Sequence, residues 1–379
     1  MGGMLATAAA SAGIRPAWGD TLPDYSGPNV IIIRFGGGVR RRETIDAEHT
    51  YAPFLIKELA ARGTLYPNMV IDQIEDINTS HGEGTLYILT GKYEKYQDVA
   101  GKFLAARFES KVPTLFEYLR KTYAVPEHQT LIVNGEDRTD EEFYSFSNHH
   151  LFGANFRSET LSLYRYKIFL LRRQIAEARW AGKELAAKMA ELTKMESLDY
   201  RSQGGRQHPE VEAFWEKWRA FYGESGLVNP RGDRLLTELA QWSLKHLRPK
   251  LMMVNYNDPD YVHWGNMSFY TRGISAIDQG LRELVASVES DPEYRENTVF
   301  VIVPDCGRDT NPLAPVPCQH HFNSRSSREI WALLVGSGVA KGRVVDRQVD
   351  QTSIAKTVGQ IMGAPAEFAE GPVLEEVFA

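Results

Sequence analysis

Short apolar runs alternate along this chain with segments of helical periodicity, and this alternation constrains the fold more than any other feature. The apolar, strand-like runs lie at residues 29–33, 65–71, 129–133, 251–255, 298–303 and 330–335. Apolar residues at helical spacing lie between or after them, at 51–62, 112–123, 235–247, 270–288 and 351–362. Strands connected through helices pair in parallel and are covered on both faces. The sequence therefore predicts an α/β fold with a mostly parallel central sheet flanked by helices.

A long segment without this alternation interrupts the pattern. Residues 158–222 are dense in Leu, Ala, Lys, Glu and Arg, which predicts a helical insertion or cap. We therefore assign residues 29–157 and 223–379 to the α/β domain. Because loops at the carboxyl edge of such sheets accept additions, we expect residues 158–222 to lie over that edge and restrict access to it.

Composition excludes some partners. The chain has 43 Lys and Arg against 49 Asp and Glu, a net charge of −6, which argues against a nucleic-acid partner. No run approaches the roughly 20 apolar residues that a membrane-spanning helix needs. Residues 1–28 are either the remnant of an export signal or a flexible tail. Residues 10–12 match the A-x-A pattern of a signal-peptidase site but no basic segment precedes them, so a periplasmic or extracellular location and a cytoplasmic one both stay open.

Acidic residues and histidines follow two of the predicted strands. Asp258, Asp260 and His263 come just after 251–255, and Asp305 comes just after 298–303. Strand ends gather at the carboxyl edge of a parallel sheet, where such side chains suit a divalent metal. Two adjacent imidazoles could join them, His320 and His321. The alternative is structural, with Asp258 as a helix cap and His263 on a surface turn.

A polar, glycine-bearing loop offers an attacking group. It contains Thr79, Ser80 and His81 and precedes the apolar stretch LYILTG. A hydroxyl here could be activated by a metal or by His81. Thr79 or Ser80 could instead cap a helix, and a capped helix terminus also binds anions.

Taken in order, these motifs resemble those of the alkaline phosphatase and sulfatase superfamily, and more narrowly the bacterial sulfatase-like hydrolases. The resemblance rests on NVIII followed by GGG and VR, on TSHGEGTLYILTGKY, on DPDYVHWGN, on NTVFVIVPDCGRD and on QHH. It implies two divalent metals at the carboxyl edge and a Ser, Thr or modified Cys that attacks a phosphoryl or sulfuryl centre. It makes Ser80, or failing that Thr79, the nucleophile. It implies that one metal is held by His263 together with Asp258 or Asp260, and that His320 or His321 completes this site. Asp305 would belong to the other metal.

The chain departs from that pattern at the second of these metals. Gly36, Gly37 and Gly38 stand where the family usually has an Asp, and Cys306 stands where it usually has a His. A Cys306 thiolate could ligate zinc, and the missing acid could be replaced only from elsewhere, by Glu43, Asp76 or Glu83. The sulfatase signature Cys/Ser-x-Pro-x-Arg is absent from the nucleophile loop. We expect one tight metal site and leave a second open.

Arginines around the first turn could hold an anion in place of metal charge, since guanidinium matches phosphate and sulfate geometry. We name Arg40 and Arg308 as substrate-binding candidates. Arg40 belongs to the first turn, together with Arg34, Arg41 and Arg42. The alternative for these turn arginines is a solvated basic surface. The expected activity is hydrolysis or transfer of small-molecule or glycan phosphate or sulfate esters with Zn²⁺, Mn²⁺, Mg²⁺ or Ca²⁺. The alternative is a catalytically degenerate protein that binds anions or glycans or has a structural role.

Overall fold

A central nine-stranded sheet organises the computed structural model, which describes residues 22–72, 79–94, 109–134, 144–198, 207–224, 232–264, 266–310, 318–320 and 324–379. The strand order is β4-β3-β5-β1-β6-β7-β2-β8, and β9 pairs with β2. The strands are β1 Asn29–Arg34, β2 Gly63–Val70, β3 Thr130–Asn134, β4 Glu159–Ser162, β5 Leu251–Asn255, β6 Thr298–Val303, β7 Glu329–Gly336, β8 Arg343–Val344 and β9 Val349–Asp350.

The predicted α/β class is confirmed, because most neighbouring strands run parallel. β1 pairs in parallel with both β5 and β6, and β3 pairs in parallel with β4 and β5. The exception is β7, which is antiparallel to β6 and to β2. The carboxyl ends of β1, β5 and β6 therefore meet at one edge of the sheet.

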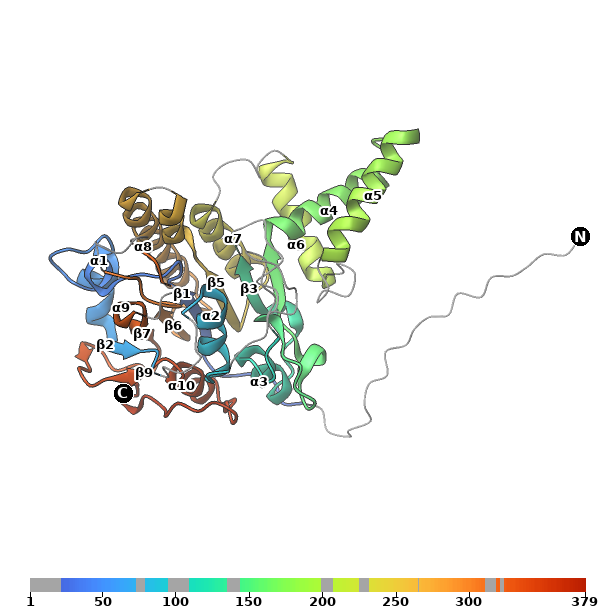
Figure 1. Cartoon of the computed structure of the whole chain (residues 1–379). Coiled ribbons are helices and arrows are strands. Elements are labelled where there is room, and N and C mark those ends of the chain that lie inside the picture. Colours follow the sequence, from blue (N-terminus) through green and yellow to red (C-terminus); the bar gives the residue numbers. More distant parts are fainter. Residues whose placement is uncertain are drawn as a thin grey trace, which may run out of the picture.

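Helices cover both faces of the sheet (Figure 1). They are α1 Arg41–Thr44, α2 His81–Thr90, α3 Leu115–Thr122, α4 Leu163–Ala176, α5 Gly182–Leu198, α6 Pro209–Tyr222, α7 Asp233–His246, α8 Met267–Ser290, α9 Arg325–Arg328 and α10 Ser353–Ile361. Alternate residues of β1 explain the two layers, because successive side chains of a strand point to opposite faces. Ile31 and Ile33 pack with α7 and α8 in one core, whereas Val30 and Ile32 pack with α2, α3 and α10 in the other.

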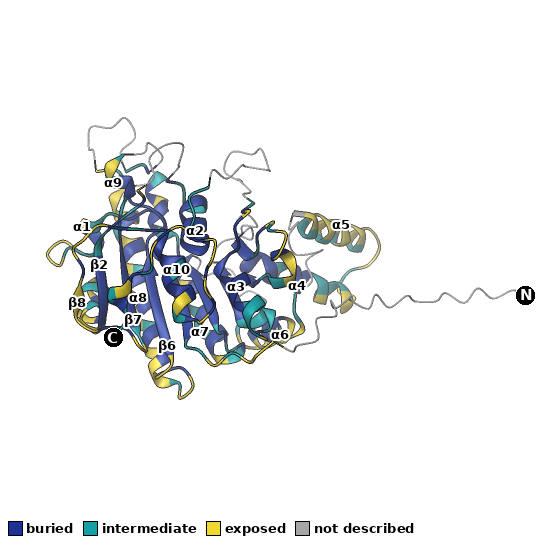
Figure 2. Ribbon diagram, turned by 90° about the horizontal axis from the view of Figure 1, so that it is seen from below, coloured by how far each residue is buried: buried dark blue, intermediate teal, exposed yellow. Residues whose placement is uncertain are grey.

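The segment predicted as a helical insertion begins as part of the sheet. Residues 159–162 form β4, which pairs with β3, so the helical part starts at Leu163 in α4. The described helices α4, α5 and α6 project at the side of the sheet that β4 ends (Figure 1), and much of α5 is exposed (Figure 2). They do not lie over the ends of β1, β5 and β6, contrary to our expectation. The reason is positional: α4 continues directly from the outermost strand.

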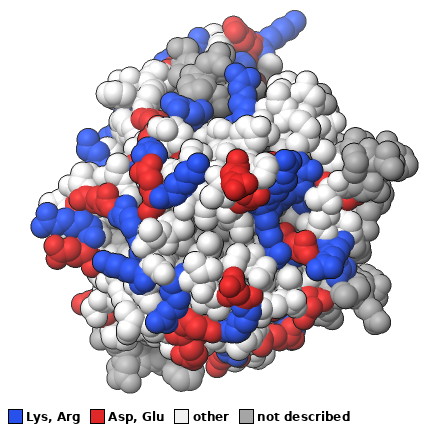
Figure 3. Space-filling model, turned by 90° about the vertical axis from the view of Figure 1, so that its left-hand side faces the viewer, with Lys and Arg blue, Asp and Glu red and all other residues white. Residues whose placement is uncertain are grey.

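The surface charge, the helix lengths and the amino-terminal segment concern the predictions on nucleic acid, membrane and the tail. On the face shown in Figure 3, acidic and basic side chains are interspersed. None of the helices among the described residues combines the length and apolar character needed to cross a bilayer. Of the predicted tail, residues 1–21 lie outside the described part of the chain. Tyr25 packs edge-on against Tyr123, with ring centroids 5.1 Å apart, so the end of that segment is attached to the domain.

Candidate metal centre and active site

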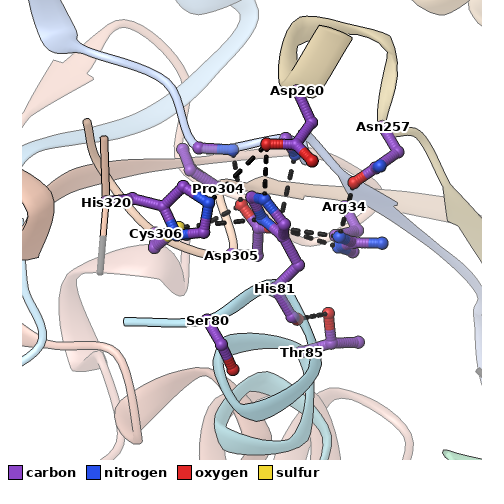
Figure 4. Close-up of polar contacts among 12 residues, drawn as sticks. Arg34, Ser80, His81, Thr85, Asn257, Asp260, Pro304, Asp305, Cys306 and His320 are labelled. Carbon is purple, nitrogen blue, oxygen red and sulfur yellow. Dashed lines mark hydrogen bonds and ion pairs between the residues drawn. The ribbon is translucent and has the colours of Figure 1, made fainter. Parts of the chain in front are cut away.

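Polar side chains converge at the carboxyl edge, where β1, β5 and β6 end beside the amino terminus of α2 (Figure 4). Arg34 is the last residue of β1, and Asp305 lies two residues beyond β6. Asp260 and His263 belong to a short 3-10 helix, Asp258–Trp264, that follows β5. Parallel pairing thus brings together groups that are more than 200 residues apart in sequence.

Asp260 is the centre of this cluster and is almost fully buried. Its Oδ1 lies 3.0 Å from Nε2 of His263 and 3.6 Å from Nε2 of His320. The same oxygen lies 2.9 Å from Nε2 of His81 and 2.9 Å from Nη2 of Arg308. Burial alone would raise the pKa of Asp260, but the facing His81 and the other imidazoles outweigh it and hold that pKa well below its usual range.

Asp260, His263 and His320 fit a divalent cation. The ligand atoms of these three residues all lie within 4.8 Å of one another. Nδ1 of His320 lies 2.8 Å from the backbone carbonyl of Thr79 and donates to it, which directs the lone pair of Nε2 toward Asp260. Ligands each about 2.0–2.2 Å from a zinc ion stand roughly 3.4 Å apart in a tetrahedral site. The observed separations of 3.0 and 3.6 Å agree with that spacing.

A second triad, His81, Cys306 and His320, shares His320 with the first. It suits a metal less well. Nδ1 of His81 lies 2.7 Å from Oδ2 of Asp305. The same Nδ1 lies 3.8 Å from Sγ of Cys306, so Asp305 already engages the ring nitrogen that faces the thiol. Without a metal, burial and secondarily the charge of Asp305 raise the pKa of that thiol to about 11. The described residues therefore favour the triad around Asp260.

Asp305, which the family resemblance gave to the other metal, is surrounded by hydrogen-bond donors. Its Oδ2 accepts from Arg34 Nη2 (2.7 Å), Arg34 Nε (3.3 Å), His81 Nδ1 (2.7 Å) and the Gly37 amide (3.3 Å), and its Oδ1 accepts from the amides of Gly38 (3.2 Å) and Cys306 (2.8 Å). Burial alone would raise its pKa, but His81 and Arg34 hold the pKa well below the usual range. Asp305 belongs to neither triad.

Asp258 also departs from the assignment to a metal. Its Oδ2 accepts the amide N–H of Asp233 at 3.2 Å, at the start of α7. The carboxylate of Asp233 in turn accepts the amides of Asn257 and Asp258, at 2.8–3.1 Å. Asp258 therefore contacts the first residue of α7, whose N-cap residue is Gly232. The sequence did not point to Asp233 as part of this region. The available signal was Gly232-Asp233 just before an amphipathic segment, which is typical of a helix start.

At the amino terminus of α2 the imidazole, and not a hydroxyl, faces the cluster. His81 is the first residue of the helix, and its ring lies between Asp260 and Asp305 (Figure 4). Ser80 is the N-cap; its Oγ accepts the amide of Glu83 at 3.2 Å and donates to Oε2 of Glu83 at 2.8 Å. The Thr79 hydroxyl donates to the carbonyl of His320. Burial alone would lower the pKa of His81, but Asp260 and Asp305 raise it well above its usual value.

The two arginines named for substrate binding have internal partners. Arg308 has no exposed surface; it donates to Asp260 and to the backbone carbonyls of Gly37, Gly38 and Cys318. Arg40 bonds bidentately to Glu43 at 2.7 and 2.9 Å. Glu43 bonds to Arg40 and Glu83 bonds to Ser80, whereas His321 and Asp76 lie outside the described residues.

Comparison with known proteins identifies the fold. No family model and no curated protein matches the sequence. Among solved structures, a variant of the alkaline phosphatase PafA is similar, with a TM-score of 0.59, 11% identity, and coverage of 95% of this chain and 100% of that chain. A 2-O GAG sulfatase is similar at a TM-score of 0.54 and 13% identity, covering 92% and 74%. The lipoteichoic acid synthase LtaP from Listeria monocytogenes is similar at a TM-score of 0.50 and 12% identity, covering 93% and 75%.

The chain therefore has the fold of the alkaline phosphatase superfamily, as the motifs predicted. Phosphatases, sulfatases and a lipoteichoic acid synthase share this fold. At these identities the likeness shows the fold alone.

Proposed function

We propose that this protein is a metal-dependent hydrolase or transferase that acts on phosphate or sulfate esters. One observation carries the proposal: Asp260, His263 and His320 converge beside the amino terminus of α2. A carboxylate with two imidazoles is a common ligand set for a catalytic cation. The N–H groups at the start of a helix of ten residues favour an anion next to it.

The side chains of this site would divide the work. The bound cation would polarise the phosphoryl or sulfuryl oxygen. Asp305 orients His81 through Nδ1, which leaves Nε2 to exchange a proton on the side that faces Asp260. The attacking oxygen comes from water in this proposal, since Ser80 would first have to rotate away from Glu83.

For the substrate we propose a small-molecule or glycan ester. The support is indirect: one structural relative is a 2-O GAG sulfatase, and another was solved with k-i-k-neocarrahexaose. Zn²⁺ suits the nitrogen-rich ligand set best among the cations that we expected.

The test is a turnover assay on chelator-stripped protein before and after reloading with Zn²⁺, Mn²⁺, Mg²⁺ or Ca²⁺. Aryl phosphate monoesters, aryl phosphate diesters and aryl sulfate serve as substrates. We expect turnover that a chelator abolishes and that the Asp260→Asn variant lacks. Full activity in the Asp260→Asn variant would contradict the proposed site.

The second candidate function is binding of anions or glycans without cleavage, by a protein that has this fold but has lost catalysis. It is favoured by the 2.9 Å contact of Arg308 with Asp260, because a guanidinium there already neutralises the carboxylate. In that case no ester would turn over with any cation, and chelator treatment would leave binding of a sulfated oligosaccharide unchanged. Chelator-sensitive turnover would exclude this candidate.

A further inference from the structure

The buried guanidinium of Arg34 joins the ends of the three central strands. Arg34 ends β1 and has no exposed surface. It donates to Asn255 at the end of β5, to Asn257 just beyond it at 3.1 Å, and to Asp305 beyond β6 at 2.7 Å. Because an unpaired buried charge is costly, these partners are needed to hold it. A permanent positive charge is thus fixed at the carboxyl edge.

The first turn is shaped to leave room for this guanidinium. A Cβ placed on Gly36 would lie 2.9 Å from Cζ and Nε of Arg34 and 2.2 Å from the carbonyl oxygen of Tyr256. No side chain of any kind, an acidic one included, fits at Gly36 without displacing those groups. A metal-ligating side chain therefore has no room at Gly36 while Arg34 occupies this place.

Asp305 is committed to the same arginine. Both of its oxygens accept hydrogen bonds from neighbouring donors, and Arg34 supplies two of them to Oδ2. A divalent ion could use this carboxylate only by displacing those donors. Oδ1 of Asp260 also has donors, His81 and Arg308, at 2.9 Å each. Asp260 differs from Asp305 in belonging to a triad, with His263 and His320, whose ligand atoms all lie within 4.8 Å of one another.

We infer that Arg34 takes the place of a second divalent cation, so that the chain binds one metal ion and carries its other positive charge in its own sequence. The inference rests on the cation site of the proposed function. Arg34 is a positioning residue: it holds Asp305, and Asp305 in turn orients His81. A guanidinium stays charged at every physiological pH and does not exchange. The second charge is thereby independent of metal supply.

The primary test is the metal stoichiometry of the full chain. Chelator-stripped protein is reloaded with Zn²⁺ or, separately, Mn²⁺, and bound metal is counted by plasma mass spectrometry and by calorimetric titration. We expect one equivalent per chain. Two tight equivalents would overturn the inference and leave the proposed function standing, whereas no bound metal would overturn both.

Two variants test which carboxylate is a ligand. Asp305→Asn should still bind one equivalent, because in our inference Asp305 holds Arg34 and not a metal. Asp260→Asn should bind none. Loss of metal from Asp305→Asn, with the fold intact by circular dichroism, would overturn the inference.

Substitutions of Arg34 itself give the complementary result. Arg34→Met removes the fixed charge and leaves Asp305 in need of a cation, so we expect a second, weaker equivalent. Arg34→Lys keeps a charge and should stay at one equivalent. A folded Arg34→Met protein that binds only one equivalent would contradict the inference, and if Arg34→Met does not fold, the Asp305→Asn result decides.

Discussion

Nη2 of Arg34 lies 2.7 Å from Oδ2 of Asp305, and neither side chain has any exposed surface. Removing one member of a buried ion pair leaves the other charged and unsolvated, which typically costs about 3–5 kcal/mol. We therefore expect Arg34→Met to lower the free energy of unfolding by about that amount in urea denaturation. Arg295→Met is the control, since its 3.6 Å pair with Glu296 is on the surface and should cost less than about 1 kcal/mol. Equal losses in the two variants would contradict the structural role of the buried pair.

His263 should be needed for metal binding and not for folding. His263→Ala removes one imidazole ligand and leaves Asp260 with its contacts to His81 and Arg308, so the stripped protein should melt close to wild type. Its affinity for Zn²⁺ should fall by more than about 100-fold, because losing a residue that merely hydrogen-bonds to a ligand already costs about 10- to 100-fold. His150→Ala, on an exposed loop, is the matched control and should bind metal normally. Wild-type metal occupancy in His263→Ala would show that the cation site is placed wrongly.

Neighbouring residues at the start of α2 should separate catalysis from capping. His81→Gln should lower kcat/KM by about 10²- to 10⁴-fold, the usual worth of a proton-transferring side chain. Ser80→Ala should instead destabilise the fold by about 1 kcal/mol through the lost N-cap and leave turnover within about tenfold of wild type. Both quantities are measured on the reloaded proteins. A larger loss of turnover in Ser80→Ala would make Ser80 the attacking hydroxyl.

Gly36 should tolerate no side chain. Gly36→Ala places a Cβ against the backbone of Tyr256, so we expect a loss of about 3 kcal/mol in unfolding free energy. Gly338→Ala provides the contrast, because Gly338 has φ 70° and its Cβ would meet nothing within 4 Å. It should cost only the roughly 1–2 kcal/mol of a left-handed backbone. A milder effect at Gly36 than at Gly338 would mean that the first turn can move.

The pair of Arg248 with Asp291 should make stability depend on pH in the acid range. Hydrogen bonds from Arg248 lower the pKa of Asp291 to about 2, below its unfolded value of about 3.9. A depressed folded pKa gives stability that is present above the unfolded pKa and is lost as the pH falls toward 2. Wild type should exceed Asp291→Asn by about 1 kcal/mol at pH 6, since solvent screens this partly exposed pair, and by almost nothing at pH 2. A difference that grows on acidification would contradict the assigned pair.

The sequence predicted the layers of this protein better than its site. β1, β5 and β6 are buried on both faces and therefore appear as continuous apolar runs, and the amphipathic α7 and α8 show their buried stripe directly. The motif order was enough to predict the superfamily fold. The antiparallel direction of β7 could not be predicted, because an apolar run has the same composition in either direction.

The directions of the side chains at the strand ends could not be predicted from the sequence. Asp258 and Asp260 are two residues apart, yet the first accepts the amide of Asp233 and the second faces the histidines. Ser80 and His81 are adjacent, yet Glu83 turns the hydroxyl along the helix. Such choices depend on partners that only the folded chain brings near.

The reversal of β7 has a consequence for how this site can change during evolution. Because β6 and β7 are antiparallel neighbours, the connection between them leaves and returns at the same edge of the sheet. Arg308 and His320 both lie on that connection, between two anchored strands. Insertions or deletions between these two residues need not shift any strand register. The length and sequence of this connection can therefore change while the sheet stays the same. Such changes would alter the preference for substrate and for metal.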